Sequence, residues 1–189
     1  MGFFTAVKRW IGARPYLREL RARPELGFSV LFDAAYYRIN FHGYRGRWPP
    51  LLHFIVAGAF EGRDPHPLFD TAFYLRNNPD LAANSVNPLF HYLLHGAAEG
   101  RKPHPLFEPA YYAAQLPVAR GNHLLEYLKT GRESHAQPHP LFDGRGHLSA
   151  HAESGGRGAN PLVEFVLHGA GPVTEGSQFG QSSLAPGGD

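Results

Sequence analysis

FDTAFYLRNNPDLAANSVNPLFHYLLHGAAEGRKPHPLF, residues 69–107, is the clearest copy of a segment that recurs along the chain. Related openings are LFDAAYY from Leu31, LFEPAYY from Leu106 and LFDGRGH from Leu141. The Phe of these openings stands at positions 32, 69, 107 and 142, at intervals of 37, 38 and 35 residues. Such a period is typical of repeat proteins, whose units bury a core by stacking on one another. The sequence therefore predicts four units.

The second half of each unit has helical spacing. Apolar residues and a small residue at i, i+3, i+4 and i+7, which share one helical face, start from four leucines: Leu51, Leu89, Leu124 and Leu162. Asn87-Pro88 and Asn160-Pro161 each offer an N-cap followed by a proline in the first helical position. Three glycines suit the left-handed residue that follows a helix: Gly96, Gly131 and Gly169. We therefore expect a short helix that is stable only when it packs on its neighbours.

The first half of each unit also predicts a helix. An acidic residue able to cap it follows the repeated Phe: Asp33, Asp70, Glu108 and Asp143. An aromatic pair comes next in three units: Tyr36-Tyr37, Phe73-Tyr74 and Tyr111-Tyr112. Pro79 and Pro117 then end or kink the helix. Each unit is thus expected to be a helix–turn–helix, joined to the next by an extended Pro-His-Pro-Leu-Phe run.

The fourth unit departs from the pattern. Its first half lacks the aromatic pair and is crowded by glycines, which argue against a helix there: Gly144, Gly146, Gly155, Gly156 and Gly158. Two interpretations stay open, a terminal cap with one face toward solvent or a degraded unit. From about Gly171 the chain is rich in Gly, Ser, Gln and Pro, which predicts disorder.

The predicted fold class is all-α. Hydrophobic residues make up 43% of the chain and charged residues 18%, which is enough apolar material for a packed core. The 17 Pro and 22 Gly predict short helices, and Pro15 limits a leader helix to a short piece. No run approaches 18 apolar residues, so no membrane-spanning helix is expected. The predicted divisions are a basic amphipathic leader (1–30), an array (31–170, as 31–66, 67–104, 105–139 and 140–170) and a disordered tail (171–189).

The motif of residues 69–107 resembles a repeat of bacterial proteins of surface-polysaccharide synthesis, which commonly stands beside glycosyltransferase domains. The family pattern is roughly F-D-x-x-Y-Y-L, P-D-V, D/N-P-L-x-H-Y-L and G-x-x-E-G-R-x-P. It is met by Phe69, Asp70, Tyr74, Leu75, Pro79, Asp80, Asn87, Pro88, Leu89, His91, Tyr92, Leu93, Gly96, Glu99, Gly100, Arg101 and Pro103. The resemblance is close over 67–107 and loose over 31–170. It implies a non-catalytic interaction or scaffold module with a protein or glycan partner.

An alternative is a fragment or divergent member of a glycosyltransferase that lacks its catalytic domain. The chain has no Asp-x-Asp motif, which metal-dependent sugar transferases use to hold a nucleotide diphosphate. The Gly155–Gly158 run follows no β-branched segment and does not indicate a phosphate loop. The absence of Cys excludes disulfides and thiol nucleophiles. The sequence predicts no catalytic residue and no cofactor, and an enzyme is the less favoured class.

Twelve His residues raise the question of a metal or ligand site. His91 and His95 are four residues apart and share a helical face, as in some metal sites, but we favour structural roles at the helix end for both. A histidine between two prolines recurs in each linker, and an arginine recurs just past each second helix. These residues are candidates for contact with a protein or glycan: His66, His104, His139, Arg63, Arg101 and Arg132. Turn contacts and salt bridges are the favoured alternative for them.

The leader carries most of the positive charge. Residues 1–23 have a net charge of +5 and the rest of the chain −3, so a nucleic-acid-binding surface is not supported. Candidates for contact with an anionic membrane or an acidic partner are Phe3, Phe4, Lys8, Arg9, Trp10 and Arg14. Simple packing on the first unit is the alternative. Because charges interrupt the early apolar residues, no secretory signal is predicted, and the expected location is the cytoplasm or the inner face of the membrane.

Overall fold

The chain of 189 residues is seen in a computed structural model. The structure describes residues 3–41, 48–83, 86–118, 121–130, 133, 135–150 and 160–168. These residues form helices and turns, and none of them belongs to a β-strand; His66 with Phe69 and His104 with Phe107 form isolated bridges. The described part of the chain is therefore all-α, as predicted. The predicted disordered tail, 171–189, lies outside the described residues.

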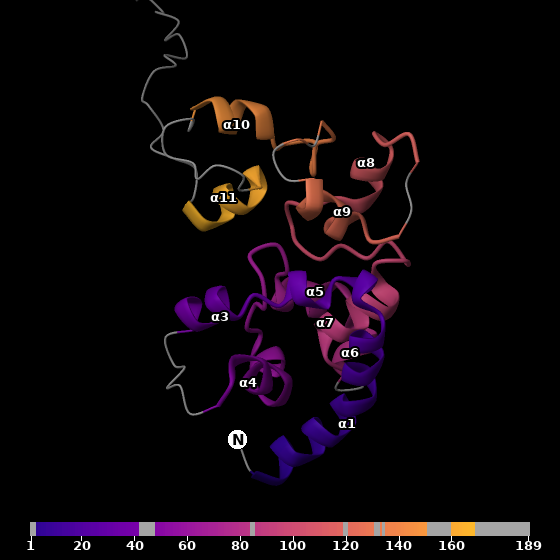
Figure 1. The fold of residues 1–189 in the computed structure, drawn as a ribbon, viewed down its shortest axis with the longest axis vertical. Helices are drawn as coiled ribbons and strands as arrows, with labels where there is room; N and C mark the ends of the chain where they lie inside the picture. The colour runs from indigo at the N-terminus through magenta and orange to yellow at the C-terminus, as the bar shows by residue number, and fades with distance from the viewer. Residues whose placement is uncertain are drawn as a thin grey trace, which may run out of the picture.

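After a long first helix, short helices pack together in chain order (Figure 1). The partners in contact are α3 (Ala34–Asn40) with α4 (Pro50–Val56), α5 (Thr71–Asn77) with α6 (Pro79–Ala83) and α7 (Pro88–His91), α8 (Pro109–Ala113) with α9 (His123–Thr130), and α10 (Gly144–Ala150) with α11 (Pro161–His168). A 3₁₀ helix, η1 (Pro24–Leu26), and one turn, α2 (Phe28–Leu31), lead into α3. In Figure 1 α3 and α4 lie on the left, α8 and α9 at the upper right, and α10 and α11 at the upper left.

The first helix, α1 (Phe3–Ala22), corrects the prediction of short helices only. It runs for 20 residues with Pro15 inside it. A proline in a helix interior removes one backbone hydrogen bond and costs about 3 kcal/mol relative to alanine. Ala13, Leu17 and Leu20 are buried, and α1 packs along α4. Packing of this face therefore outweighs the cost of Pro15, whose own side chain is exposed.

The acidic residues that open the first three units differ in how they cap. Oδ1 of Asp70 accepts a hydrogen bond from the backbone N–H of Phe73 at 2.7 Å, and Asp33 caps α3 in the same way. Glu108 makes no capping bond with its side chain; it pairs instead with Lys102. The predicted caps are thus confirmed for the two aspartates, and the extra methylene group of glutamate explains the exception because it moves the carboxylate away from the helix end.

The asparagine caps of the second helices are confirmed as well. Oδ1 of Asn87 accepts from the N–H groups of Leu89 and Phe90 at 3.1 and 3.2 Å, and Oδ1 of Asn160 accepts from Leu162 at 3.1 Å. Both asparagines are buried. Proline follows each of them, as expected for a first helical position, where its missing N–H has no partner to lose.

The prediction that Gly96 is a left-handed cap is wrong. The helix that begins as α7 continues through a π-helical turn, η3 (Tyr92–Gly96), and Gly96 keeps a negative φ. In the first two units the left-handed glycines are Gly62 and Gly100, with φ of 73° and 71°, which stand four residues after Gly58 and Gly96. Gly131 and Gly169, the other two predicted caps, lie outside the described residues.

The linkers join neighbouring units through a recurring backbone hydrogen bond. The backbone N–H of the acidic residue that opens each of the first three units donates to a proline carbonyl in the following linker: Asp33 to Pro65 at 2.9 Å, Asp70 to Pro103 at 3.0 Å, and Glu108 to Pro138 at 2.8 Å. The Phe of each linker is buried: Phe69, Phe107 and Phe142. Each linker is therefore tied to the start of the unit before it by its proline and anchored in the core by its phenylalanine.

The first helix of the fourth unit is present, although its glycines argued against it. Oδ1 of Asp143 accepts from the backbone N–H groups of Arg145 and Gly146 at 3.1 and 3.0 Å, which caps α10. His147 packs on Phe165 of α11, with ring centroids 5.7 Å apart. A capped first turn and the ring contacts of His147 with Phe142 and Phe165 thus offset the low helix propensity of glycine.

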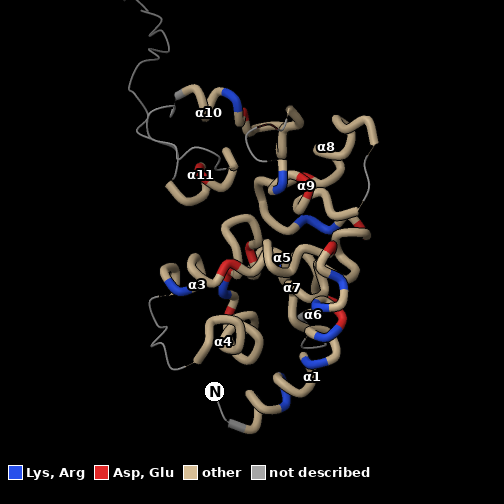
Figure 2. The backbone as a smooth tube through the Cα atoms, viewed as in Figure 1, with Lys and Arg blue, Asp and Glu red and all other residues tan. Residues whose placement is uncertain are grey.

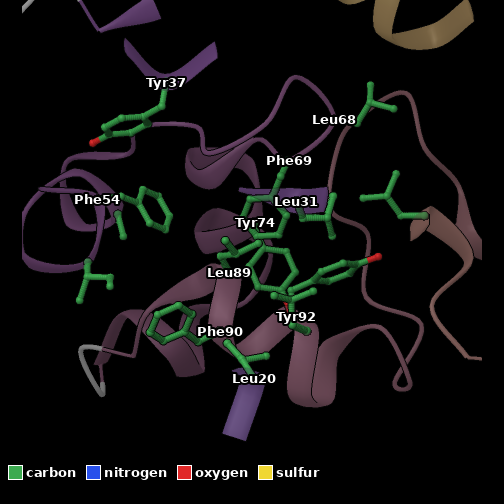
Figure 3. Close-up of a cluster of buried hydrophobic side chains, with 14 of the residues drawn as sticks. Leu20, Leu31, Tyr37, Phe54, Leu68, Phe69, Tyr74, Leu89, Phe90 and Tyr92 are labelled. Atoms are coloured by element: carbon green, nitrogen blue, oxygen red, sulfur yellow. The ribbon is translucent and has the colours of Figure 1, made fainter. Parts of the chain in front are cut away.

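One hydrophobic core runs through the described residues from α1 to α11. Its buried members include Leu17 in α1, Phe54 in α4, Tyr92 in η3 and Leu162 in α11. Figure 3 shows the central part, where the rings of Phe69, Tyr74 and Tyr92 meet between α5 and α7. The core therefore gives α1 a fixed place beside the later units.

No helix in the described ranges combines the length and the hydropathy required to cross a bilayer.

Candidate functional site

Three aromatic positions meet in the centre of each unit. The rings belong to Phe32, Tyr37 and Phe54; to Phe69, Tyr74 and Tyr92; to Phe107, Tyr112 and Tyr127; and to Phe142, His147 and Phe165. In the second unit, Tyr74 and Tyr92 lie edge to face, with centroids 5.8 Å apart and planes at 87°. Edge-to-face packing is favourable for aromatic rings. These tyrosines are buried core residues rather than exposed platforms for a sugar ring.

In each of the first two units, a tyrosine of the first helix forms a hydrogen bond with a histidine of the second helix. The hydroxyl of Tyr74 lies 3.0 Å from Nδ1 of His91, and the hydroxyl of Tyr37 lies 2.8 Å from Nδ1 of His53. Burial lowers the pKa of His53 and of His91 below the usual value of 6.5. The neutral imidazole is therefore favoured at both positions. In the third and fourth units the corresponding position is held by a glutamate, so this bond is specific to the first two units.

Glycine is required beside each of these hydroxyls. A Cβ atom on Gly96 would overlap the hydroxyl oxygen of Tyr74, and a Cβ atom on Gly58 would overlap that of Tyr37. Both glycines lie in the turn that continues the second helix, η3 for Gly96 and the 3₁₀ turn η2 (Gly58–Glu61) for Gly58. The repeated glycine thus allows a helix to approach a buried tyrosine closely, which the spacing alone did not reveal.

His91 and His95 do not form a metal centre with other residues in the part of the chain that the structure describes. Their ring centroids are 5.6 Å apart, but Nδ1 of His91 is engaged by Tyr74. No group of three or more His, Cys, Asp or Glu side chains in the described segments is placed to hold a metal ion. The pair therefore lacks the third protein ligand that zinc sites usually have.

Each of the three linker histidines accepts a hydrogen bond within a backbone turn. Nδ1 of each accepts a hydrogen bond from the backbone N–H two residues later: His66 from Leu68 at 3.0 Å, His104 from Leu106 at 3.1 Å, and His139 from Leu141 at 3.1 Å. Burial lowers the pKa of His66 to about 4 and also lowers the pKa of His104. A nitrogen that accepts a hydrogen bond carries no proton, so the turn requires a neutral imidazole. The lowered pKa favours the same neutral form.

The arginines proposed for partner contact face their own unit. Arg101 donates to Oδ1 of Asn78 at 2.7 Å and to both carboxylate oxygens of Asp80 at 3.1 Å, and it pairs with Glu99 at 2.6 Å. The guanidinium of Arg63 lies 4.3 Å from the ring centre of Phe41. Arg132 lies outside the described residues. These contacts position the turn after the second helix, and they occupy much of the hydrogen-bonding capacity of Arg101.

The leader candidates divide into an internal and an external set. Arg9 donates to the carbonyl of Val56 at 3.0 Å and stacks its guanidinium 3.8 Å from the ring centre of Phe60, so it fastens α1 to the first unit. The exposed members are Phe4, Lys8, Trp10 and Arg14. The side chain of Phe3 lies outside the described residues. The structure thus leaves these four side chains exposed on α1, with Lys8 apart from Trp10 and Arg14, and assigns Arg9 to the fold.

A cleft between α1 and the first two units combines polar and aromatic side chains from several elements. It measures about 450 Å³, and its lining includes Thr5, Lys8, Tyr16, Phe60, Asn87 and Phe90. These residues come from distant parts of the sequence, and no motif links them. Of the residues that line the cleft, Lys8 and Arg9 were contact candidates from the sequence and the others were not, because the cleft exists only where α1 crosses η2 and α7.

The cleft offers a ligand cationic groups, hydroxyl groups and an aromatic face. Lys8 and Tyr16 are exposed at its rim, while Arg9 remains stacked on Phe60 at its wall. A lysine ammonium group binds carboxylates and phosphates as a point charge, and a tyrosine ring packs on the apolar face of a sugar.

Comparison of the chain with protein-family models, with curated proteins and with solved structures finds no match.

Proposed function

We propose that the chain is a non-catalytic helical-repeat module that holds a protein or glycan partner in bacterial surface-polysaccharide synthesis. The pathway comes from the motif resemblance of residues 69–107. The proposal places the module in the cytoplasm, beside the glycosyltransferases that the resemblance implies. Its architecture is an array of four helix–turn–helix units, which the recurring aromatic triplets and the recurring bonds from acidic caps to linker prolines support.

The proposal of a non-catalytic role rests on the contacts that the side chains of the 69–107 motif make with one another. Tyr74 and His91 bond to each other, Gly96 makes room for the Tyr74 hydroxyl, and Arg101 binds Asp80. The motif therefore encodes packing, capping and turns. An active site instead needs side chains that converge on a reacting atom. The motif residues in the described segments are spread through the core and the corners of the units.

An acidic glycan is the ligand that the cleft beside α1 suits best. Its accessible charge comes from Lys8, and its accessible ring comes from Tyr16. A carboxylated sugar would pair with the first and pack on the second. This assignment makes the junction of α1 with the first two units, and not a catalytic pocket, the place where a sugar polymer is held.

The first experiment separates a binding module from a transferase. The purified full chain is incubated with nucleotide sugars and Mg²⁺ or Mn²⁺, and release of nucleoside diphosphate is measured. We expect no release above that of a protein-free control. Sustained turnover would favour the alternative, a divergent glycosyltransferase, and would contradict the proposal.

The second experiment tests the cleft. Polygalacturonate, an acidic polymer, and dextran, a neutral one, are titrated into the chain and binding is followed by calorimetry. We expect binding of the acidic polymer, with affinity reduced several-fold by Lys8→Glu. Arg38→Glu, which changes an exposed arginine of α3, is the matched control and leaves the affinity unchanged. Equal loss in both variants, or no binding of the acidic polymer, would show that the cleft is not a glycan site.

A further inference from the structure

The outer face of α1 presents its large apolar side chains to solvent. Phe4 is 80% exposed, Ile11 58% and Trp10 38%. The buried face carries the smaller Ala6, Ala13, Leu17 and Leu20. Phe4 and Ile11 are seven residues apart and share the side of α1 away from the core, whereas Trp10 lies at the border of the buried face, four residues after Ala6 and three before Ala13. This distribution is the reverse of the usual one, in which a surface helix buries its largest apolar residues.

The apolar surface extends from α1 onto the start of the first unit. Trp48, which is 38% exposed and precedes α4, lines a hollow of about 330 Å³ together with Val7, Trp10, Leu52 and Val56. Trp10 and Trp48 are the only two tryptophans of the chain. Tryptophan favours the boundary between hydrocarbon and lipid headgroups because its indole ring is apolar and its N–H is polar.

Arginines continue the same side of α1 toward its C-terminal end. Arg14, Arg18 and Arg21 follow Trp10 at four, eight and eleven residues, and together they line a groove on the outer side of the helix. All three arginines are exposed. The one acidic residue of α1, Glu19, pairs with Arg23 at 3.3 Å. Figure 2 shows basic positions spaced along α1 from its middle to its end.

We propose that the α1 outer face (Phe4, Trp10, Ile11, Trp48, Arg14, Arg18 and Arg21) docks on an anionic lipid bilayer. The helix lies in the membrane plane, with its aromatic and aliphatic side chains among the headgroups and upper acyl chains and its arginines on lipid phosphates. Charge alone would suit an acidic protein equally well. The exposed Phe, Ile and Trp side chains favour the bilayer, because lipid supplies apolar contact next to a layer of phosphates.

This surface is separate from the glycan cleft, and it stands independently of the proposed function. Lys8 and Tyr16 line the cleft on one flank of α1, whereas Trp10, Arg14 and Arg21 lie on the other flank. A bilayer on the outer face would leave the cleft open toward η2 and α7. The two sites therefore have different variants, different probes and separable outcomes.

Tryptophan fluorescence gives a direct test, because both tryptophans belong to the proposed surface. The full chain is mixed with vesicles of phosphatidylglycerol and phosphatidylcholine, or of phosphatidylcholine alone, at low and at high salt. We expect co-sedimentation with the anionic vesicles, an emission shift to shorter wavelength, and quenching by lipids with brominated acyl chains. High salt weakens the binding because it screens the arginines.

Two variants and one control locate the surface. Each basic residue near an anionic leaflet contributes about 1 kcal/mol, so Arg14→Glu with Arg18→Glu lowers the partition coefficient at least ~tenfold. Phe4→Ser with Ile11→Ser keeps both tryptophans and all charges, and it reduces both binding and the emission shift. Arg38→Glu with Arg76→Glu makes the same change in net charge on exposed residues of α3 and α5 and is expected to retain most of the binding. Far-UV circular dichroism of every variant checks that the helices are intact.

Three results would overturn the proposal. One is the absence of binding to anionic vesicles at low salt. Another is vesicle binding without a shift of tryptophan emission and without quenching by brominated lipids, together with equally strong binding to soluble polyglutamate. That combination would assign the face to an acidic protein partner. The last is equal loss of binding in the α1 variants and in the Arg38→Glu, Arg76→Glu control, which would show that net charge and not this face governs binding.

Discussion

The hydroxyl group of Tyr74 determines which residue can stand at position 96. We expect Gly96→Ala to lower the free energy of unfolding by about 1–3 kcal/mol, because the new methyl group overlaps that hydroxyl in a packed core. Gly12→Ala is the control. Position 12 lies in α1 with open space around it, so alanine there stabilises the helix by about 0.5–1 kcal/mol. Urea unfolding measures both changes.

The same contact can be isolated by a double-mutant cycle. Tyr74→Phe removes the hydroxyl that Gly96→Ala would strike, so the glycine substitution costs less in the Tyr74→Phe chain than in the wild type. Purely additive effects of the two substitutions would contradict the close-approach explanation for Gly96.

Burial of His66 makes stability depend on pH. The native pKa is about 4 and the unfolded value is 6.5, so the unfolded chain binds a proton first as the pH falls. The stabilising effect of the neutral imidazole is complete above pH 6.5 and is lost as the pH falls toward 4, with a total of about 3 kcal/mol. The pKa of Asp64 is raised to about 6 by burial and acts in the opposite direction, so it partly masks this loss in the wild type.

A matched variant separates the contribution of His66. His66→Asn removes the titrating group, and its side-chain oxygen can still accept from the N–H of Leu68. We expect the free energy of unfolding of the wild type to fall by up to about 3 kcal/mol relative to that of the variant as the pH falls from 6.5 to 4, as measured by urea unfolding at several pH values. A difference that stays constant over this range would contradict the role assigned to His66.

At the scale of the element, α1 shows how packing overrides propensity. Pro15 is exposed in the interior of the helix, where it removes a hydrogen bond without adding a buried contact. We expect Pro15→Ala to raise the free energy of unfolding by about 1–3 kcal/mol. Pro24→Ala is the control, because Pro24 opens η1, where proline is compatible with the backbone, and alanine there is neutral or destabilising by up to about 1 kcal/mol. Thermal melts followed by circular dichroism compare the two, and an unchanged Tm for Pro15→Ala would indicate that the helix already bends to accommodate the ring.

At the scale of the whole molecule, the asparagine caps could be predicted from the local sequence, and features that depend on distant neighbours could not. The asparagine caps at Asn87 and Asn160 were predictable because the cap and the N–H groups it binds are two or three residues apart. The reason for Gly96 was hidden because it depends on Tyr74, a residue of another helix. The cleft at Tyr16 was hidden for the same reason, since α1 reaches it only after the chain has folded back on itself.

The core that joins α1 to α11 predicts cooperative unfolding. Phe107 is fully buried in the third unit, far along the chain from Trp10 and Trp48, and its replacement by alanine costs about 3–5 kcal/mol. We expect Phe107→Ala to lower the urea midpoint measured by tryptophan fluorescence, which reports on α1 and the first unit, as much as the midpoint measured by circular dichroism, which reports on all helices. In an array with weak coupling between units, the fluorescence transition would stay at its wild-type midpoint while the dichroism curve split into two steps. That split would show that the first unit is stable without the third, and it would contradict a single cooperative core.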